Sequence, residues 1–185
     1  MPAMIAILRG VNVGTHGRIS MEALRTLCGS LGWQGVQTYV QSGNVVFRTK
    51  ERDLHLLTQR FEDAFEKTFG FRAALVLRTT SEMRSVIAAN PFAKRKDIEP
   101  GKFHVLFLAE ESSHEVRKQL EATQVGPEEI KTRAREVFVY YPNGAGQSKL
   151  PAVMDRILKK AGTARNWNSV TRLLEMAEKL EDSLG

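Results

Sequence analysis

Two periodicities of hydrophobic positions run along the chain, and together they predict a mixed fold of helices and strands. Short apolar runs such as residues 3–9 and 72–78 are typical of buried strands, whereas the apolar spacing over residues 21–31 is that of an amphipathic helix. In the first half, the predicted elements follow the order strand, helix, strand, strand, helix, strand. This order is the split βαβ pattern of a ferredoxin-like lobe.

The same order begins again after residue 102. Residues 103–109 predict a strand, Ser112 with Glu115 predicts a helix start, and residues 129–141 predict a hairpin. Residues 163–168 (TARNWN) are short and polar for a fourth strand, so we expect the last strand of this lobe to be incomplete or altered. A C-terminal helix follows. The predicted fold class is therefore α+β, with two ferredoxin-like lobes.

The stretch 91–102 (PFAKRKDIEPGK) contains two prolines and four lysine or arginine residues, a composition typical of a linker. We therefore predict a first lobe over residues 1–90, which includes a short helix after its last strand. The linker then covers 91–102, and the second lobe with the C-terminal helix covers 103–185. The halves share no obvious sequence motif, so the predicted duplication is one of architecture.

Composition narrows the range of functions. The 185 residues include one cysteine, Cys28, so an intramolecular disulfide is impossible, which fits a reducing compartment. No apolar run approaches the ~20 residues that span a bilayer, so we expect a cytoplasmic protein without a membrane partner. The net charge of +6 fits an anionic partner, such as nucleic acid or a phosphorylated metabolite, and equally a solvated basic surface.

The motif search assigns no cofactor and no metal. The four histidines lack metal-ligand spacing, and one cysteine cannot build a thiolate zinc site. The glycine-rich loop 10–17 is not the dinucleotide fingerprint, and residues 143–149 do not match a phosphate-binding Walker loop. Lys149 is the one candidate general base, and a solvated lysine is the plainer interpretation. Whether the protein is an enzyme stays open.

Particular polar clusters remain at 9–14 (RGVNVG), 41–44 (QSGN) and 163–168 (TARNWN), with a weaker one at 146–150 (GQSKL). In a split βαβ lobe the first and third strands are antiparallel neighbours, so the first two clusters should lie side by side. The candidate ligand-binding residues are Arg9, Gly10, Asn12, Gly14, Ser42, Gly43, Asn44, Lys149, Arg165, Asn166, Trp167 and Asn168.

These residue types favour an anion. An arginine fork binds phosphate or carboxylate, a helix start such as that near Ser20 carries partial positive charge, and glycines let the backbone approach a ligand. The leading hypothesis is that the protein binds a small anionic or phosphorylated ligand at the loop edge of the first lobe. This edge either faces the second lobe or lies apart from it. The alternative is RNA or DNA binding through the basic stretches 94–96, 131–135 and 156–165.

A purely structural interpretation competes with each candidate. The glycines and asparagines of the first lobe then satisfy tight turns, Asn168 caps a helix, and Trp167 fills an interface.

The motifs AILRGVNVG and TYVQSGNVVF, together with TARNWNSVTRL, resemble those of the bacterial family filed as domain of unknown function 1697. The resemblance runs over nearly the whole chain. Members commonly show threonine where this chain has Ser169, which is a mild departure. The resemblance implies a two-lobed arrangement of ferredoxin-like α/β plaits, and it implies no activity.

Overall fold

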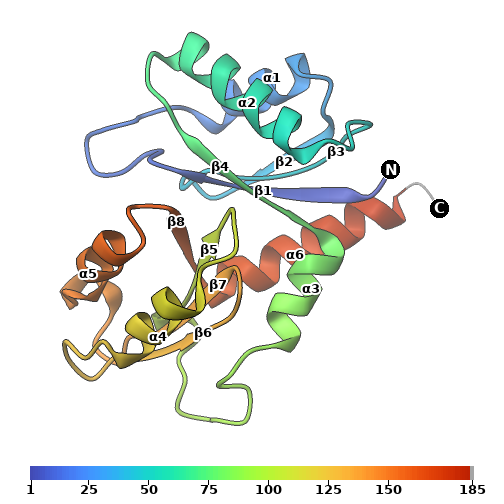
Figure 1. Ribbon diagram of the computed structural model, residues 1–185. Helices are drawn as coiled ribbons and strands as arrows, with labels where there is room; N and C mark the ends of the chain where they lie inside the picture. Colours follow the sequence, from blue (N-terminus) through green and yellow to red (C-terminus); the bar gives the residue numbers. More distant parts are fainter. Residues whose placement is uncertain (184–185) are drawn as a thin grey trace. The chain divides into compact units, whose positions relative to one another are not determined.

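The structure, a computed structural model, describes residues 1–183. Contacts within the chain form two compact units: residues 1–84 with the segment from Arg172 onward, and residues 85–171. Each unit contains one four-stranded antiparallel sheet flanked by helices (Figure 1). The predicted α+β fold with two ferredoxin-like lobes is therefore confirmed.

In the first unit the sheet has the strand order β2-β3-β1-β4. Alternate residues of these strands face α1 and α2, and they meet the apolar stripes of both helices in one core. The ring of Trp33 stacks on Phe47 at 3.7 Å and on Phe61 at 5.3 Å within it. The elements are β1 (Ala3–Arg9), α1 (Met21–Ser30), β2 (Gln34–Tyr39), β3 (Asn44–Arg48), α2 (Leu54–Phe69) and β4 (Ala74–Thr79).

The second unit repeats this arrangement, with the strand order β6-β7-β5-β8. Helices α4 and α5 pack on one face of its sheet, over a core that includes Leu106, Val137 and Met154. The elements are η1 (Pro100–Lys102), β5 (Phe103–Leu108), α4 (His114–Ala122), β6 (Glu129–Thr132), β7 (Glu136–Tyr140), η2 (Ala145–Gln147), α5 (Leu150–Ile157) and β8 (Gly162–Asn166).

The last strand corrects one expectation, because β8 is complete. It pairs antiparallel with β5 from Gly162 opposite Leu108 to Asn166 opposite His104. Its alternation is hidden from a hydropathy pattern, since the polar Thr163 and Arg165 are buried while Ala164 is exposed. A strand in which the polar residues are the buried ones has no apolar signature.

Two helices follow the fourth strands of the sheets: α3 (Thr80–Ala88) after β4, and α6 (Trp167–Asp182) after β8. The end of α6 is anchored in the first unit. The carboxylate of Glu181 accepts hydrogen bonds from the backbone N–H of Ala3 at 2.9 Å and from the hydroxyl of Thr80 at 2.8 Å. The contact-based units thus divide the chain elsewhere than the predicted ranges 1–90, 91–102 and 103–185.

The stretch 91–102 lies within the second unit and is anchored there. Phe92 is buried and packs edge-on against Phe103, with ring centroids 5.4 Å apart. The guanidinium of Arg95 forms ion pairs with Asp97 at 2.6 Å and Glu129 at 2.7 Å. These contacts give a proline-containing stretch a defined path.

Candidate functional site

The loop edge of the first lobe forms where β1 ends and β3 begins, as the antiparallel pairing of these strands predicts. The backbone N–H of Leu8 donates to the carbonyl oxygen of Gly43 at 2.9 Å, and Asn44 lies opposite Ile7 in the register. Arg9, the last residue of β1, is half-buried. The two predicted clusters therefore do lie together.

Asn12 holds the loop after β1 closed. Its backbone N–H donates to Gly17 O at 2.8 Å, and its Oδ1 accepts from the N–H of Ile19 at 2.9 Å. Its Nδ2 donates to Gln41 O at 2.6 Å and to Ile19 O at 3.2 Å. One side chain thus ties loop 10–19 to itself and to the turn before β3.

Asn44 has a similar place in the turn between β2 and β3. Its side chain is fully buried, and Nδ2 donates to Tyr39 O at 2.9 Å and to Ser42 Oγ at 3.0 Å. Buried amide groups of this kind fix a turn because an unpaired donor there is costly. The amide groups of both candidate asparagines are therefore engaged within the protein.

Glycine is required at two positions of this edge. A Cβ on Gly17 would lie 2.4 Å from the carbonyl oxygen of Gly10, so no other residue fits without moving the backbone. Gly43 has a φ of 86°, and its Cβ would come within 3.0 Å of Leu8 Cβ. Gly10 and Gly14, by contrast, face open space. Gly10, Gly14 and Gly43 are among the candidates predicted from the sequence, whereas Gly17 is not.

Val40 is a strained residue that the sequence analysis also missed. Its φ is 51°, a left-handed conformation that is strongly disfavoured for a β-branched side chain, and it is 48% exposed. Asn12, whose side chain donates to the carbonyl oxygen of Gln41, has a φ of 52°. Two left-handed non-glycine residues thus meet at the loop edge, and their strain is not offset by burial of Val40.

Positive charge gathers on the same loop. Arg9 is half-buried, while Arg18 is exposed. No acidic residue occurs between Arg9 and Ile19. The nearest acidic side chain in sequence is Glu22, in the first turn of α1, where Ser20 Oγ already accepts a hydrogen bond from the N–H of Ala23 at 3.0 Å.

The comparisons with known proteins assign the family. The model described as "Protein of unknown function (DUF1697)" matches residues 1–138. The chain belongs to this family. The family match covers the whole first-lobe loop edge and stops before Lys149 and the 163–168 cluster.

A solved structure of the conserved bacterial protein SP0830 from Streptococcus pneumoniae resembles this DUF1697 protein with a TM-score of 0.74 and 21% sequence identity. The similarity covers 95% of this chain and 98% of that chain, and it shows a shared fold. The search of curated proteins finds no match.

The candidates of the second lobe do not form a cluster comparable to the first. Arg165 is buried in β8, where its guanidinium donates to Thr163 Oγ1 at 3.0 Å and to Ala164 O at 2.8 Å. Burial lowers the pKa of Arg165 to about 10. Lys149 is exposed at the start of α5.

The remaining three candidates, Asn166, Trp167 and Asn168, belong to the start of α6. Asn166 caps this helix, because its Oδ1 accepts from the N–H of Ser169 at 2.9 Å. The capping role considered for Asn168 therefore falls to Asn166, since the helix begins two residues earlier than expected. The ring of Trp167 stacks on Phe103 at 4.7 Å.

The structure also bears on other chemistries. Cys28 is buried, and burial raises the pKa of its thiol to about 12, which suits a packing residue and not a nucleophile. Residues 1–183 contain no group of three or more histidine, cysteine or acidic side chains placed to hold a metal ion. Within the same range, no helix is both long and apolar enough to cross a membrane.

Proposed function

We propose that the protein binds a small anionic ligand, carrying a phosphate or carboxylate group, at the loop edge formed by residues 9–19 and 40–43. The observation that carries this proposal is the strained, hydrogen-bonded junction between Asn12 and the Val40–Gln41 peptide. Left-handed non-glycine residues persist where the surroundings over-determine them, and they concentrate at ligand sites. Val40 itself is 48% exposed, so burial of its side chain does not offset the strain.

The chemistry of the loop edge supports an anion. Arg9 and Arg18 supply donors and positive charge, and no acidic residue lies between them. No heavy atom lies within 4 Å of the position that a Cβ would take on Gly10 or Gly14, so a ligand can come close to the backbone there. Because Asn12 orders the loop before any ligand arrives, binding would cost little conformational entropy.

Titration with inorganic phosphate, pyrophosphate and citrate tests the proposal, with amide chemical shifts and calorimetry as readouts. We expect shifts centred on Gly10 and Gly14 for at least one anion, and affinity reduced about tenfold in Arg9→Ala and in Arg18→Ala. Arg52→Ala, at an exposed arginine before α2, is the matched control. If Arg9→Ala and Arg18→Ala both bind the anions as the parent and the control do, the loop edge is not the site.

The competing expectation, RNA or DNA binding, has less support. In the three basic stretches, Arg95 is ion-paired, the guanidinium of Arg133 donates to Ser85 O at 3.2 Å, and Arg165 is buried. Other cations of these stretches, such as Lys96, Lys131 and Lys159, are exposed. Affinity for short oligonucleotides measured at several salt concentrations distinguishes the two functions. A steep negative slope of log affinity against log salt would favour nucleic acid over a small ligand.

A further inference from the structure

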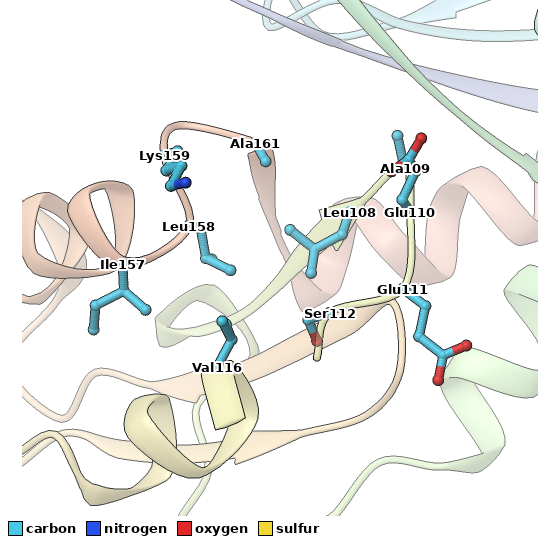
Figure 2. A pocket seen from close by; sticks show the side chains of 10 residues that line it. All are labelled: Leu108, Ala109, Glu110, Glu111, Ser112, Val116, Ile157, Leu158, Lys159 and Ala161. Carbon is cyan, nitrogen blue, oxygen red and sulfur yellow. The ribbon is translucent and has the colours of Figure 1, made fainter. Parts of the chain in front are cut away.

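A pocket of about 570 Å³ opens in the second unit at the end of β5. Figure 2 shows the side chains of Leu108, Val116 and Leu158 pointing into one space, with Ala161 at its border. These residues come from three different segments: the last residue of β5, the first turn of α4 and the end of α5. The volume is within the range of small-molecule sites, roughly 300–1,000 Å³.

The pocket exists because this unit lacks the apolar cover that the first unit has. After β1, the long loop places Val11 in the core and packs Ile19 against it. After β5, the corresponding loop 109–113 (AEESS) has no large apolar side chain. Moreover, α5 has 8 residues whereas its counterpart α2 has 16. A short polar loop and a short helix leave a hollow above Leu108, Val116 and Leu158, although Leu108 and Leu158 are themselves largely buried.

Unpaired cations border this floor. Arg156, Lys159 and Lys160 are exposed at the end of α5, and none of them forms an ion pair within residues 1–183. Lys159 belongs to the 570 Å³ pocket, and all three line an adjoining hollow of about 480 Å³ with Ala152 and Asp155. The lysines have φ values of 52° and 59°, so this chain keeps two left-handed lysines in a turn where glycine would fit more easily.

The two acidic residues of the 570 Å³ pocket, Glu110 and Glu111, lie apart from Lys159, whereas Asp155 lies beside the lysines in the adjoining hollow. In Figure 2 the carboxylate of Glu111 lies on the loop side, away from Lys159, and Glu110 lies on the same loop. Glu111 is also 3.8 Å from Arg117, which compensates part of its charge. The pocket therefore has an apolar floor and one cationic end.

We propose that this pocket binds an amphipathic anion, with an apolar body on Leu108, Val116 and Leu158 and an anionic head at Lys159 and Lys160. The site is separate from the loop edge of the first lobe and needs a different ligand. Inorganic phosphate has no apolar body and should not compete for it. The two proposals can therefore fail independently.

The probe is anilinonaphthalene sulfonate, which combines an aromatic body with an anionic head and fluoresces when bound in apolar surroundings. We expect one site per chain, displaced by decanoate and not by decanol at equal concentration. Lys159→Glu combined with Lys160→Glu should weaken binding about tenfold or more. Ala161→Trp, which fills the mouth of the pocket, should abolish it, whereas Lys118→Glu on the exposed face of α4 should leave it unchanged.

Thermal melts of each variant verify that it is folded, since this dye also binds partly unfolded protein. Binding that survives both the charge reversal and Ala161→Trp would overturn the proposal. Cosedimentation with phosphatidylglycerol vesicles separates a free ligand from a lipid surface. The proposal would also be overturned if the protein binds no dye in solution but adsorbs to vesicles, and decanoate does not reduce this adsorption.

Discussion

The side-chain amide of Asn12 donates a hydrogen bond of 2.6 Å to the backbone carbonyl of Gln41. This bond joins the loop after β1 to the turn before β3, which are 29 residues apart in sequence. The bond adds to the apolar packing of the loop after β1, whose Val11 lies in the core with Ile19 packed against it. The polar link between the two segments of the proposed anion site therefore runs through Asn12.

Replacing Asn12 with aspartate tests this link. The change keeps the Oδ1 acceptor for the N–H of Ile19 and removes the donor to Gln41, so two carbonyl oxygens lose their partner. We expect the free energy of unfolding in urea to fall by about 1–3 kcal/mol. Asn168→Asp, at an exposed asparagine of α6, is the control and should stay within about 0.5 kcal/mol of the parent. Equal stability of the Asn12 variant and the parent would contradict this account of the loop.

Val40→Gly should stabilise the protein. Glycine adopts a φ of 51° without the steric cost that valine incurs, and that relief exceeds the added entropy of the unfolded chain. We expect a gain of about 1 kcal/mol and a Tm higher by about 2–4 °C. Val125→Gly is the control, because Val125 is also exposed but does not have a left-handed φ. This variant should not have a higher Tm than the parent. A lower Tm for Val40→Gly would show that the valine is not strained.

The sequence predicted most elements because their periodicities are strong, and its failures have identifiable causes. β8 was underestimated because the buried positions of this strand are occupied by Thr163 and Arg165. The start of α6 at Trp167 was placed too late for the same reason, since the polar run conceals where strand becomes helix. The apolar stripe of α6 does not reveal which sheet it packs on.

At the candidate site, strand topology predicted that Arg9 and Asn44 lie on the same edge, and it could do so because pairing is set by the lobe fold. The path of the loop could not be predicted. The need for glycine at position 17 depends on how loop 10–19 folds back on itself, and the left-handed conformation of Val40 belongs to the turn after β2. The pocket after β5 was missed because it arises from a difference in length between α2 and α5.

Cys28 should make stability depend on alkaline pH. Its thiol has a pKa of about 12 in the folded protein, raised by burial from an ordinary value of 9.0. The contribution of this raised pKa to the stability of the folded protein is therefore complete below pH 9. It is lost as pH rises toward 12, because the thiol of the unfolded chain releases its proton at a lower pH than the buried thiol does. Relative to Cys28→Ala, the parent should lose up to about 1.4 kcal/mol per pH unit in this window. A constant difference between the two from pH 8 to pH 11 would contradict it.

Phe92 should control access of proteases to the stretch 91–102. Phe92→Ala removes a buried ring that packs against Phe103 and should cost about 3 kcal/mol or more. We expect trypsin to cleave the variant after Lys94, Arg95 or Lys96 at a higher rate than it cleaves the parent, and mass spectrometry identifies the cleavage site. Leu54→Ala, at an exposed leucine, should leave the cleavage rate unchanged. Rapid cleavage of the parent at these three residues would show that the anchoring contacts do not protect this stretch.

The anchoring of α6 in the first unit has a consequence for biosynthesis. Glu181 binds Ala3 across 178 residues of sequence, and Arg48 donates to Leu180 O at 3.2 Å across 132. A ribosome therefore completes all of residues 85–171 before it makes the helical turn that closes the unit begun by β1. We expect the second unit to acquire its native contacts first on the nascent chain, while β1 and β3 of the first sheet still lack their hydrogen bonds to α6. Truncation after residue 171 should accordingly destabilise the strands that were translated earliest.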